Sequence, residues 1–191
     1  MKILEVRRHS IADHDGKLTR EGVTLARFAC QTLITPFTRA FASPKPRAIE
    51  TAGMFGFTSP EAVEDLTTLS SEKFSPYQER IEWFASQGLS LLDAYFAVPE
   101  IMPLLVSHGK KALAALSRIA NELTDGASAL AVSHGGTIEP AALLALGGEF
   151  ELETMGGELN YCEGVRFGYV DRTIVLVETI RLPGSRRRER P

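Results

Sequence analysis

Two of the four histidines stand where strands are predicted to end. His9 directly follows the alternating segment 2–8, and His134 follows the apolar run 128–132. In open α/β sheets, ligands bind at the carboxyl ends of the strands. Two glycines come after His134, and a helix that begins there presents free backbone N–H groups and the positive end of its dipole to an anion. The spacing therefore predicts an anion site that contains both imidazoles.

Two arginines are expected at the same kind of junction. Arg8 precedes His9, and Arg47 follows the Ser-Pro turn at 43–44, where a helix begins. A guanidinium group binds phosphate oxygens two at a time, and each charge-assisted hydrogen bond contributes on the order of 1.5–3 kcal/mol. Together with the two histidines, these arginines would form a phosphate pocket that needs no metal. A single histidine or arginine at a strand end is more often structural, and the spacing alone does not bring the four residues together.

Several other chemistries lack their sequence signatures. The chain has no Gly-rich phosphate-binding loop, no dinucleotide-binding fingerprint, no Cys-x-x-Cys, no His-Glu-x-x-His and no Gly-x-Ser-x-Gly. Nucleotide-dependent, zinc-dependent and serine-hydrolase functions therefore lose their usual support, and we expect neither a metal nor a cofactor. His14 has no further ligand at a metal-site spacing beyond its two aspartate neighbours, so a solvated loop is its expected setting. His108 is expected to cap a helix.

Short strands alternate with helices along the chain. Strands are expected at 2–8, 39–42, 128–132, 165–170 and 173–180, the last two forming a hairpin. Helices are expected after the N-cap Thr19, after Pro46 and after Gly136, with two or three more in 76–124 interrupted at Pro99, Pro103 and Gly109. The packed face of the first helix is expected to carry Leu25, Phe28, Ala29 and Leu33. The alternation predicts a single three-layer α/β/α domain over residues 1–180, with a mostly parallel central sheet and an antiparallel part near its end.

The composition is that of an ordinary globular protein. Of 191 residues, 44% are hydrophobic and 24% are charged, and the two cysteines allow at most one disulfide. No apolar run is long enough to span a bilayer and no signal peptide precedes the first strand, so we expect a cytoplasmic protein without a membrane partner. The sequence carries no signature of an oligomeric state.

The formal net charge of −3 conceals an asymmetry. Five arginines and one glutamate occupy 181–191, which leaves 16 basic and 23 acidic residues, a charge near −7, in 1–180. An acidic body argues against a nucleic-acid partner. The basic tail is expected to be solvated and disordered, with a polyanion-binding arm as the alternative.

Four short motifs resemble those of the histidine phosphatase superfamily, which has the phosphoglycerate mutase-like fold. They are Arg8-His9-Ser10, Leu18-Thr19-Arg20-Glu21-Gly22, the segment 43–52 (Ser-Pro-Lys-Pro-Arg-Ala-Ile-Glu-Thr-Ala) and Val132-Ser133-His134-Gly135. Any one of these motifs would be poor grounds for an assignment, whereas the four together, in the family's order, are specific.

The resemblance implies a role for each matching residue. His9 would attack phosphorus and become a transient phosphohistidine, while Arg8 and Arg47 would hold the transferring phosphoryl group. His134 would supply a fourth cationic or hydrogen-bonding arm. Phosphoryl transfer needs mainly positioning and charge stabilisation, which such a set supplies. The remaining members of the expected phosphate-binding set are the Gly135 N–H and Ser10, which stands where the family commonly has glycine.

The proton donor to the leaving group departs from the family pattern. Where the family commonly has Leu-x-Glu, this chain has Leu66-Thr67-Thr68, and a threonine cannot donate a proton as a carboxylic acid does. Glu72 is the nearest substitute, with a plain surface charge as the alternative. A missing acid matters most for an alkoxide leaving group and less for a phosphoramidate.

This departure makes the chain most similar in pattern to the small bacterial phosphohistidine phosphatases. The expected activity is metal-independent hydrolysis of a phosphate ester or a phosphohistidine, and the expected partner is a phosphorylated small molecule or a phosphohistidine protein. A small-metabolite phosphomonoesterase and a non-catalytic phosphate-binding module are the alternatives. Mutase activity is not expected, because Ser-Ile-Ala-Asp-His-Asp at 10–15 replaces the mutase stretch Gly-Glu-Ser-x-Trp-Asn. Four aromatic residues of the helical insert are expected to pack in the core, with a substrate pocket as the alternative: Trp83, Phe84, Tyr95 and Phe96.

Overall fold

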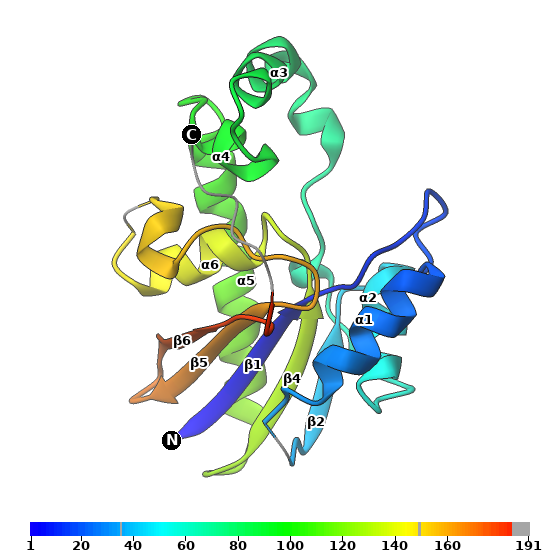
Figure 1. Ribbon diagram of the computed structural model, residues 1–191. Helices are drawn as coiled ribbons and strands as arrows, with labels where there is room; N and C mark the ends of the chain where they lie inside the picture. Colours follow the sequence, from blue (N-terminus) through cyan, green and yellow to red (C-terminus); the bar gives the residue numbers. More distant parts are fainter. Residues whose placement is uncertain (35, 149, 185–191) are drawn as a thin grey trace.

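The computed structural model describes residues 1–34, 36–148 and 150–184 and contains one six-stranded sheet (Figure 1). The strand order is β3-β2-β4-β1-β5-β6. The first four strands in this order are parallel to their neighbours, and β5 and β6 are antiparallel. Their bounds are β1 Lys2–Arg8, β2 Arg39–Ala42, β3 Glu61–Ala62, β4 Ser128–Ser133, β5 Gly164–Val170 and β6 Thr173–Ile180. The predicted mostly parallel sheet with an antiparallel end is confirmed.

Helices cover both faces of this sheet. Two of them, α1 and α2, lie on one face, and α5 and α6 lie on the other (Figure 1). The bounds are α1 Arg20–Cys30, α2 Pro46–Met54, α3 Gln78–Ser86, α4 Leu91–Phe96, α5 Met102–Glu122 and α6 Ile138–Ala145. Four short 3₁₀ turns complete the described elements: η1 Glu64–Leu66, η2 Ser71–Lys73, η3 Ser75–Tyr77 and η4 Leu152–Met155. The three-layer arrangement predicted from the alternating pattern is therefore present.

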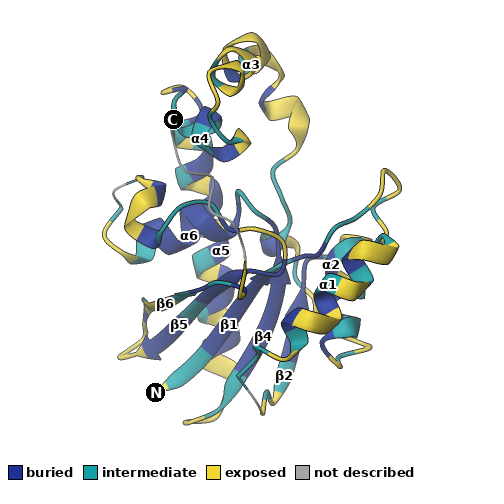
Figure 2. Ribbon diagram, viewed as in Figure 1, coloured by how far each residue is buried: buried dark blue, intermediate teal, exposed yellow. Residues whose placement is uncertain are grey.

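Alternating residues of the central strands supply two separate hydrophobic cores. In β1, Leu4 and Val6 pack with residues of α5 and α6, and in β4, Leu130 and Val132 pack with residues of α1 and α2. Successive side chains of a strand point to opposite faces, so a strand buried on both sides must be apolar almost throughout. The core strands lie deeply buried between the helices, as the dark ribbons of Figure 2 show.

A buried ion pair occupies the other face of β1, opposite Leu4 and Val6. Arg7 is fully buried, and its Nε donates a hydrogen bond of 2.7 Å to the carboxylate of Glu5. Its Nη1 donates to the carbonyl oxygen of Cys162, and its Nη2 donates to that of Thr32. Arg7 thus ties β1 to neighbouring segments and to Glu5 of the same strand.

Local signals explain where several helices begin and how they pack. The N-cap Thr19 accepts a 2.9 Å hydrogen bond from the Gly22 N–H, as predicted, and Pro46 occupies the first turn of α2. Gly109 was expected to interrupt a helix, which is wrong: it lies inside α5, where a Cβ would come within 2.8 Å of the Pro140 carbonyl carbon. The glycine allows α5 and α6 to pack closely. Phe28, expected on the packed face of α1, is exposed.

A helical insert rises above the carboxyl ends of the strands. It comprises α3, α4 and the first turns of α5, and it has a third hydrophobic core that includes Phe74, Ile81 and Leu105. Most of α3 is exposed, and Trp83 is 58% exposed (Figure 2). Within the ranges that the structure describes, no helix has the length and apolar character needed to cross a membrane.

The basic tail begins later than predicted. Arg181 directly follows β6 and donates hydrogen bonds to the folded body, and Leu182 is buried. Both residues therefore belong to the folded part of the chain. Most of the predicted tail, residues 185–191, lies outside the described residues.

Candidate active site

Three neighbouring parallel strands deliver the predicted site residues to one edge of the sheet. The strands β2, β4 and β1 are adjacent, and in their register Arg8 pairs with Ser133. The chain leaves β1 at His9 and β4 at His134, and α2, which follows β2, carries Arg47 in its first turn. Because parallel strands end at a common edge, residues distant in sequence meet there.

His9 and His134 share the guanidinium group of Arg47. The Arg47 Nε donates a 3.0 Å hydrogen bond to His9 Nε2, and its Nη2 donates a 3.2 Å hydrogen bond to His134 Nδ1. The two imidazole rings lie 4.9 Å apart between centroids. We call Arg8, His9, Arg47 and His134 the His–Arg cluster.

The tautomer of His9 follows from its two partners. Its Nδ1 lies 2.6 Å from the carbonyl oxygen of Ser10, which can only accept a hydrogen bond, so Nδ1 carries the proton. Nε2 then holds a lone pair, as the hydrogen bond received from Arg47 requires. An unprotonated imidazole nitrogen is a nucleophile.

Burial keeps both histidines neutral. It lowers the pKa of His9 to about 4, and the nearby charges of Arg47 and Arg8 add to this effect. Burial likewise lowers the pKa of His134 to about 2, with smaller contributions from His9 and Arg47. Removing a charged group from water disfavours its charged form, and neighbouring positive charges do the same to an imidazolium. At neutral pH the only formal charges of the His–Arg cluster are therefore those of its two arginines.

His134 is oriented by a hydroxyl group on the next strand end. Because Arg47 donates to Nδ1, the proton of His134 is on Nε2, which donates a 2.7 Å hydrogen bond to Ser43 Oγ. Ser43 lies 3.1 Å from the Thr67 hydroxyl. Ser43 belongs to one of the motifs noted in the sequence, but its pairing with His134 was not predicted.

Arg8 lies beside the two histidines, and part of its guanidinium group has no hydrogen-bond partner among the described residues. Its Nη1 donates to the carbonyl oxygen of Leu159 and, at 3.3 Å, to the carboxylate of Glu158. The guanidinium carbon lies 4.7 Å from the ring centroid of Tyr161, whose ring is also 5.7 Å from that of His9. Its Nε is buried and has no hydrogen-bond partner in the part of the chain that the structure describes. A buried donor without a partner is unusual in a folded protein, and a bound anion would satisfy it.

Gly135 allows Arg8 to occupy this position. A Cβ at residue 135 would lie 2.9 Å from the guanidinium carbon of Arg8 and 3.1 Å from its Nε. Such distances are too short for packed carbon and nitrogen atoms, so any side chain here would displace Arg8. The predicted proximity of Gly135 to the site is thus present.

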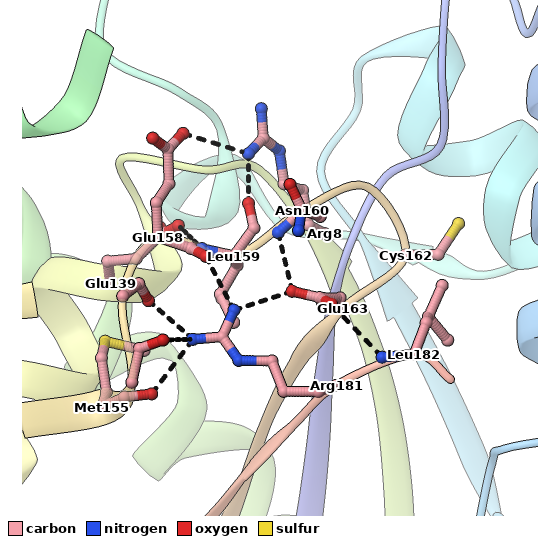
Figure 3. Close-up of polar contacts among 12 residues, drawn as sticks. Arg8, Glu139, Met155, Glu158, Leu159, Asn160, Cys162, Glu163, Arg181 and Leu182 are labelled. Atoms are coloured by element: carbon pink, nitrogen blue, oxygen red, sulfur yellow. Dashed lines mark hydrogen bonds and ion pairs between the residues drawn. The ribbon is translucent and has the colours of Figure 1, made fainter. Parts of the chain in front are cut away.

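A polar network fixes the loop that contacts Arg8 (Figure 3). Glu139 is fully buried, and its carboxylate accepts hydrogen bonds from the N–H groups of Gly136 (2.8 Å) and Leu159 (3.2 Å). Arg181 donates to the Glu163 carboxylate, and in the same loop it donates to the carbonyl oxygens of Met155, Gly156, Gly157 and Glu158. This network holds the segment 156–163 against the end of β1.

Ser10 has a different role from the predicted one. It is fully buried, its N–H donates to the Thr51 hydroxyl at 3.0 Å, and its Oγ donates to the Gly22 carbonyl oxygen at 2.7 Å. In this structure it joins the loop after β1 to α1 and α2, rather than offering its polar groups to phosphate.

Glu72 is not brought into the His–Arg cluster. It is exposed in η2, and within residues 1–34, 36–148 and 150–184 no hydrogen bond or ion pair joins its carboxylate to the cluster. Its role as the acid stays a prediction.

The two remaining histidines lie elsewhere. The side chain of His14 is 90% exposed, in keeping with a solvated loop. His108 was expected to cap a helix, which is wrong: it is buried within α5, where its Nε2 lies 3.0 Å from the Thr137 hydroxyl. Among the described residues, no three His, Cys, Asp or Glu side chains are grouped as a metal site would require.

A pocket of about 250 Å³ opens beside the His–Arg cluster. Gly135 and Gly136 form one wall, and the insert supplies much of the rest. The other lining residues are Thr68, Leu69, Ser71, Phe74, Leu91, Tyr95 and Leu105. Tyr95 had been expected in the core, with a pocket as the alternative; it contributes to both.

Residues 5–178 match the sequence model of the histidine phosphatase superfamily (branch 1). The chain matches none of the curated proteins with which it was compared.

Solved structures share this fold over nearly the whole chain. A phosphoserine phosphatase from Entamoeba histolytica, in complex with 3-phosphoglyceric acid, has a TM-score of 0.70 and 19% identity and covers 96% of this chain and 98% of its own. A phosphoglycerate mutase from Bacillus anthracis has a TM-score of 0.63 and 19% identity, with coverage of 92% and 91%. The protein histidine phosphatase SixA, complexed with tungstate, has a TM-score of 0.56 and 17% identity, with coverage of 93% and 96%. At these identities the likeness establishes the fold, and the predicted phosphoglycerate mutase-like fold is confirmed.

Proposed function

We propose that this chain, which belongs to the histidine phosphatase superfamily, hydrolyses a phosphate ester or a phosphohistidine through a covalent intermediate on His9. The observation that carries the proposal is the unprotonated Nε2 of a buried, neutral imidazole, held 3.0 Å from a guanidinium nitrogen. Such a nitrogen can attack phosphorus, and the adjacent cations can hold the phosphoryl oxygens.

The first step transfers the phosphoryl group to the protein. The lone pair of His9 Nε2 forms a bond to phosphorus while the bond to the leaving group breaks, and the leaving group departs with that electron pair. In the second step, water attacks phosphorus, the P–Nε2 bond breaks, and its electron pair returns to the imidazole. The water protons pass to phosphate and to solvent, so the net reaction consumes one water molecule and regenerates neutral His9.

The two arginines act on the transferring group in different ways. Arg47 donates to the attacking nitrogen in the structure, so an incoming phosphate must take over this hydrogen bond and release the lone pair. Arg8 offers its unpaired Nε from a position fixed by Leu159 and Glu158. His134, which receives a hydrogen bond from Arg47 and donates one to Ser43, holds the Arg47 guanidinium in place.

Trapping the phosphorylated protein tests this proposal. After brief mixing with ³²P-labelled acetyl phosphate or a labelled aryl phosphate and an alkaline quench, the wild-type chain should retain label that is stable in base and lost in acid. His9→Ala should retain none, and its turnover should fall by at least roughly 10³-fold, as expected when a nucleophile is lost. His14→Ala, an exposed histidine, is the matched control and should behave as wild type.

The alternatives give different results in the same experiment. A folded His9→Ala protein that turns over at the wild-type rate contradicts the proposal. Tight phosphate binding by the wild-type chain, without turnover of either compound or any labelled protein, would support the non-catalytic phosphate-binding module instead.

A further inference from the structure

We propose that the leaving group of the substrate is an uncharged aromatic alcohol, bound in the 250 Å³ pocket beside the His–Arg cluster. The enzyme would then be an aryl phosphatase. The inference rests on the proposed function and specifies the substrate class of the same site.

The pocket adjoins the place where phosphate would bind. Gly135 lines the pocket, and the same residue lies against the guanidinium group of Arg8. Thr68, which also lines the pocket, follows Thr67, whose hydroxyl contacts Ser43 next to His134. A phosphate held by the two arginines would therefore lie next to this pocket.

The lining suits a flat, apolar group. The side chains of Leu69, Leu91 and Leu105 and the aromatic rings of Phe74 and Tyr95 line the pocket, and no lining residue within the described chain carries a formal charge. The rings of Phe74 and Tyr95 stack with centroids 4.5 Å apart and an angle of 9° between their planes, so they form a rigid wall. Burial raises the pKa of the Tyr95 phenol, which keeps it neutral. A charged substituent on the leaving group would lose its hydration there without gaining a partner.

The size of the pocket sets a limit on this group. An apolar cavity of about 150 Å³ admits a benzene ring. The volume of about 250 Å³ found here is larger and is open to solvent, so it accommodates one aromatic ring or two fused rings. The hydroxyl groups of Thr68 and Ser71 are available to a polar substituent on the ring.

Among the described residues, the lining of the pocket has no carboxyl group, and the Glu158 carboxylate near the cluster is engaged in an ion pair with Arg8. Both points favour the same class. An alkyl phosphate releases an alkoxide and depends on a proton from a general acid, which contributes typically 10²–10⁴-fold. A phenolate is the conjugate base of an acid with a pKa of about 10, so it can depart with the electron pair of the P–O bond and take its proton from water afterwards. The described lining contains no aspartate or glutamate, and Thr68, which cannot act as a carboxylic acid, is one of its polar residues.

The substrate preference of the wild-type chain is the first test. The kcat/KM for 1-naphthyl phosphate should exceed that for phenyl phosphate by at least tenfold, because the two phenols are similar in acidity and differ mainly in the surface that the pocket can bury. Both should exceed butyl phosphate and a phosphohistidine peptide. Preference for butyl phosphate or for the phosphohistidine peptide, with the His9 phosphoprotein still formed, overturns this inference and leaves the proposed function intact.

Two pairs of variants test the pocket itself. Leu91 is exposed at the edge of the pocket, so Leu91→Glu should raise the KM for 1-naphthyl phosphate about tenfold, whereas Leu146→Glu, at an exposed leucine outside the lining, should leave it unchanged. Thr68→Glu should raise the kcat for butyl phosphate at least tenfold and give it an acidic limb in the pH profile, whereas Thr68→Gln should not. An unchanged KM in Leu91→Glu, or no gain by Thr68→Glu in a folded protein, contradicts the inference.

Discussion

His9 should remain neutral well below the pH at which histidines ordinarily become protonated. Burial, with Arg47 and Arg8 nearby, lowers its pKa to about 4. At pH 5, a histidine with this pKa is roughly 90% neutral, whereas one with the ordinary value of about 6.5 is only about 3% neutral. The proposed nucleophile is therefore neutral over the whole physiological range of pH.

Nuclear magnetic resonance measures this pKa directly. Long-range ¹H–¹⁵N correlations report the protonation of each imidazole nitrogen, and the spectrum of His9→Asn identifies the His9 signals. Titration of the ligand-free protein from pH 8 to 4 should show Nδ1 protonated and Nε2 free until the pH approaches 4. In Arg47→Met the midpoint should rise but stay below 6.5, because burial is the largest cause of the shift. A wild-type midpoint between 6 and 7 would refute the reasoning.

The same shift makes stability depend on pH. The unfolded chain binds a proton at His9 below a pH of about 6.5, while the folded chain does so only near 4, so the unfolded state binds more protons between these values. As far as His9 is concerned, the free energy of unfolding is therefore highest above pH 6.5, and it decreases as the pH falls from 6.5 toward 4. Between pH 7 and pH 5, wild type should lose about 2 kcal/mol more than His9→Asn in urea titrations, since each unit of pKa corresponds to about 1.36 kcal/mol.

Three further substitutions follow from the contacts of the site. Arg47→Met should lower kcat/KM by about 10²–10⁴-fold, because up to two charge-assisted hydrogen bonds of about 1.5–3 kcal/mol each are lost. Arg39→Met should not change kcat/KM, because Arg39, the first residue of β2, contacts only Glu61, Glu122 and the Phe41 ring among its described ionic and cation–π partners. Gly135→Ala should displace Arg8 and weaken vanadate inhibition at least tenfold. The control is Gly53→Ala, where a Cβ meets no atom within 4 Å, and it should leave inhibition unchanged. Because Gly53 lies in a helix, this control should also raise the free energy of unfolding by roughly 0.5–1 kcal/mol. Glu139→Gln should destabilise the fold by about 1–3 kcal/mol in urea titrations, because its amide nitrogen must face the N–H of either Gly136 or Leu159. Full vanadate affinity in Gly135→Ala, or unchanged stability in Glu139→Gln, would show that the contact described for that residue is energetically unimportant.

The sheet and the His–Arg cluster could be predicted because strands and their ends leave local signals. An alternating segment marks β1 and short apolar runs mark β2 and β4, and the residues that follow these strands meet at one edge once the strands are parallel. This rule identifies His9, Arg47 and His134 as candidates. Their spacing alone does not show that they share one site, and the four family motifs supply that step. Gly109 shows the limit of a local signal, since the same glycine can end a helix or let another helix approach it.

The loop that completes the site could not be predicted from local patterns. Leu159 contacts Arg8 across a separation of 151 residues. Tyr161, which also contacts Arg8, belongs to no helical or strand pattern that would single it out in the sequence. Glu139 reads in the sequence as the acidic first turn of an ordinary helix. Only the fold shows that it is fully buried and bonded to two segments. The contacts of Glu139 and Arg181 depend on where distant segments come to lie, which no single stretch of sequence specifies.

The hydrogen bonds of Arg181 determine when, during synthesis, the site can be complete. His9 precedes Arg181 by most of the sequence and is synthesised well before it, yet the segment that holds Arg8 is fastened by the Arg181 side chain, which follows β6. A nascent chain that does not yet include Arg181 contains the proposed nucleophile, but the segment 156–163 that positions Arg8 is not yet fixed. Phosphate chemistry should therefore begin only after β6 has been synthesised and docked, and fragments that stop short of it should be inert.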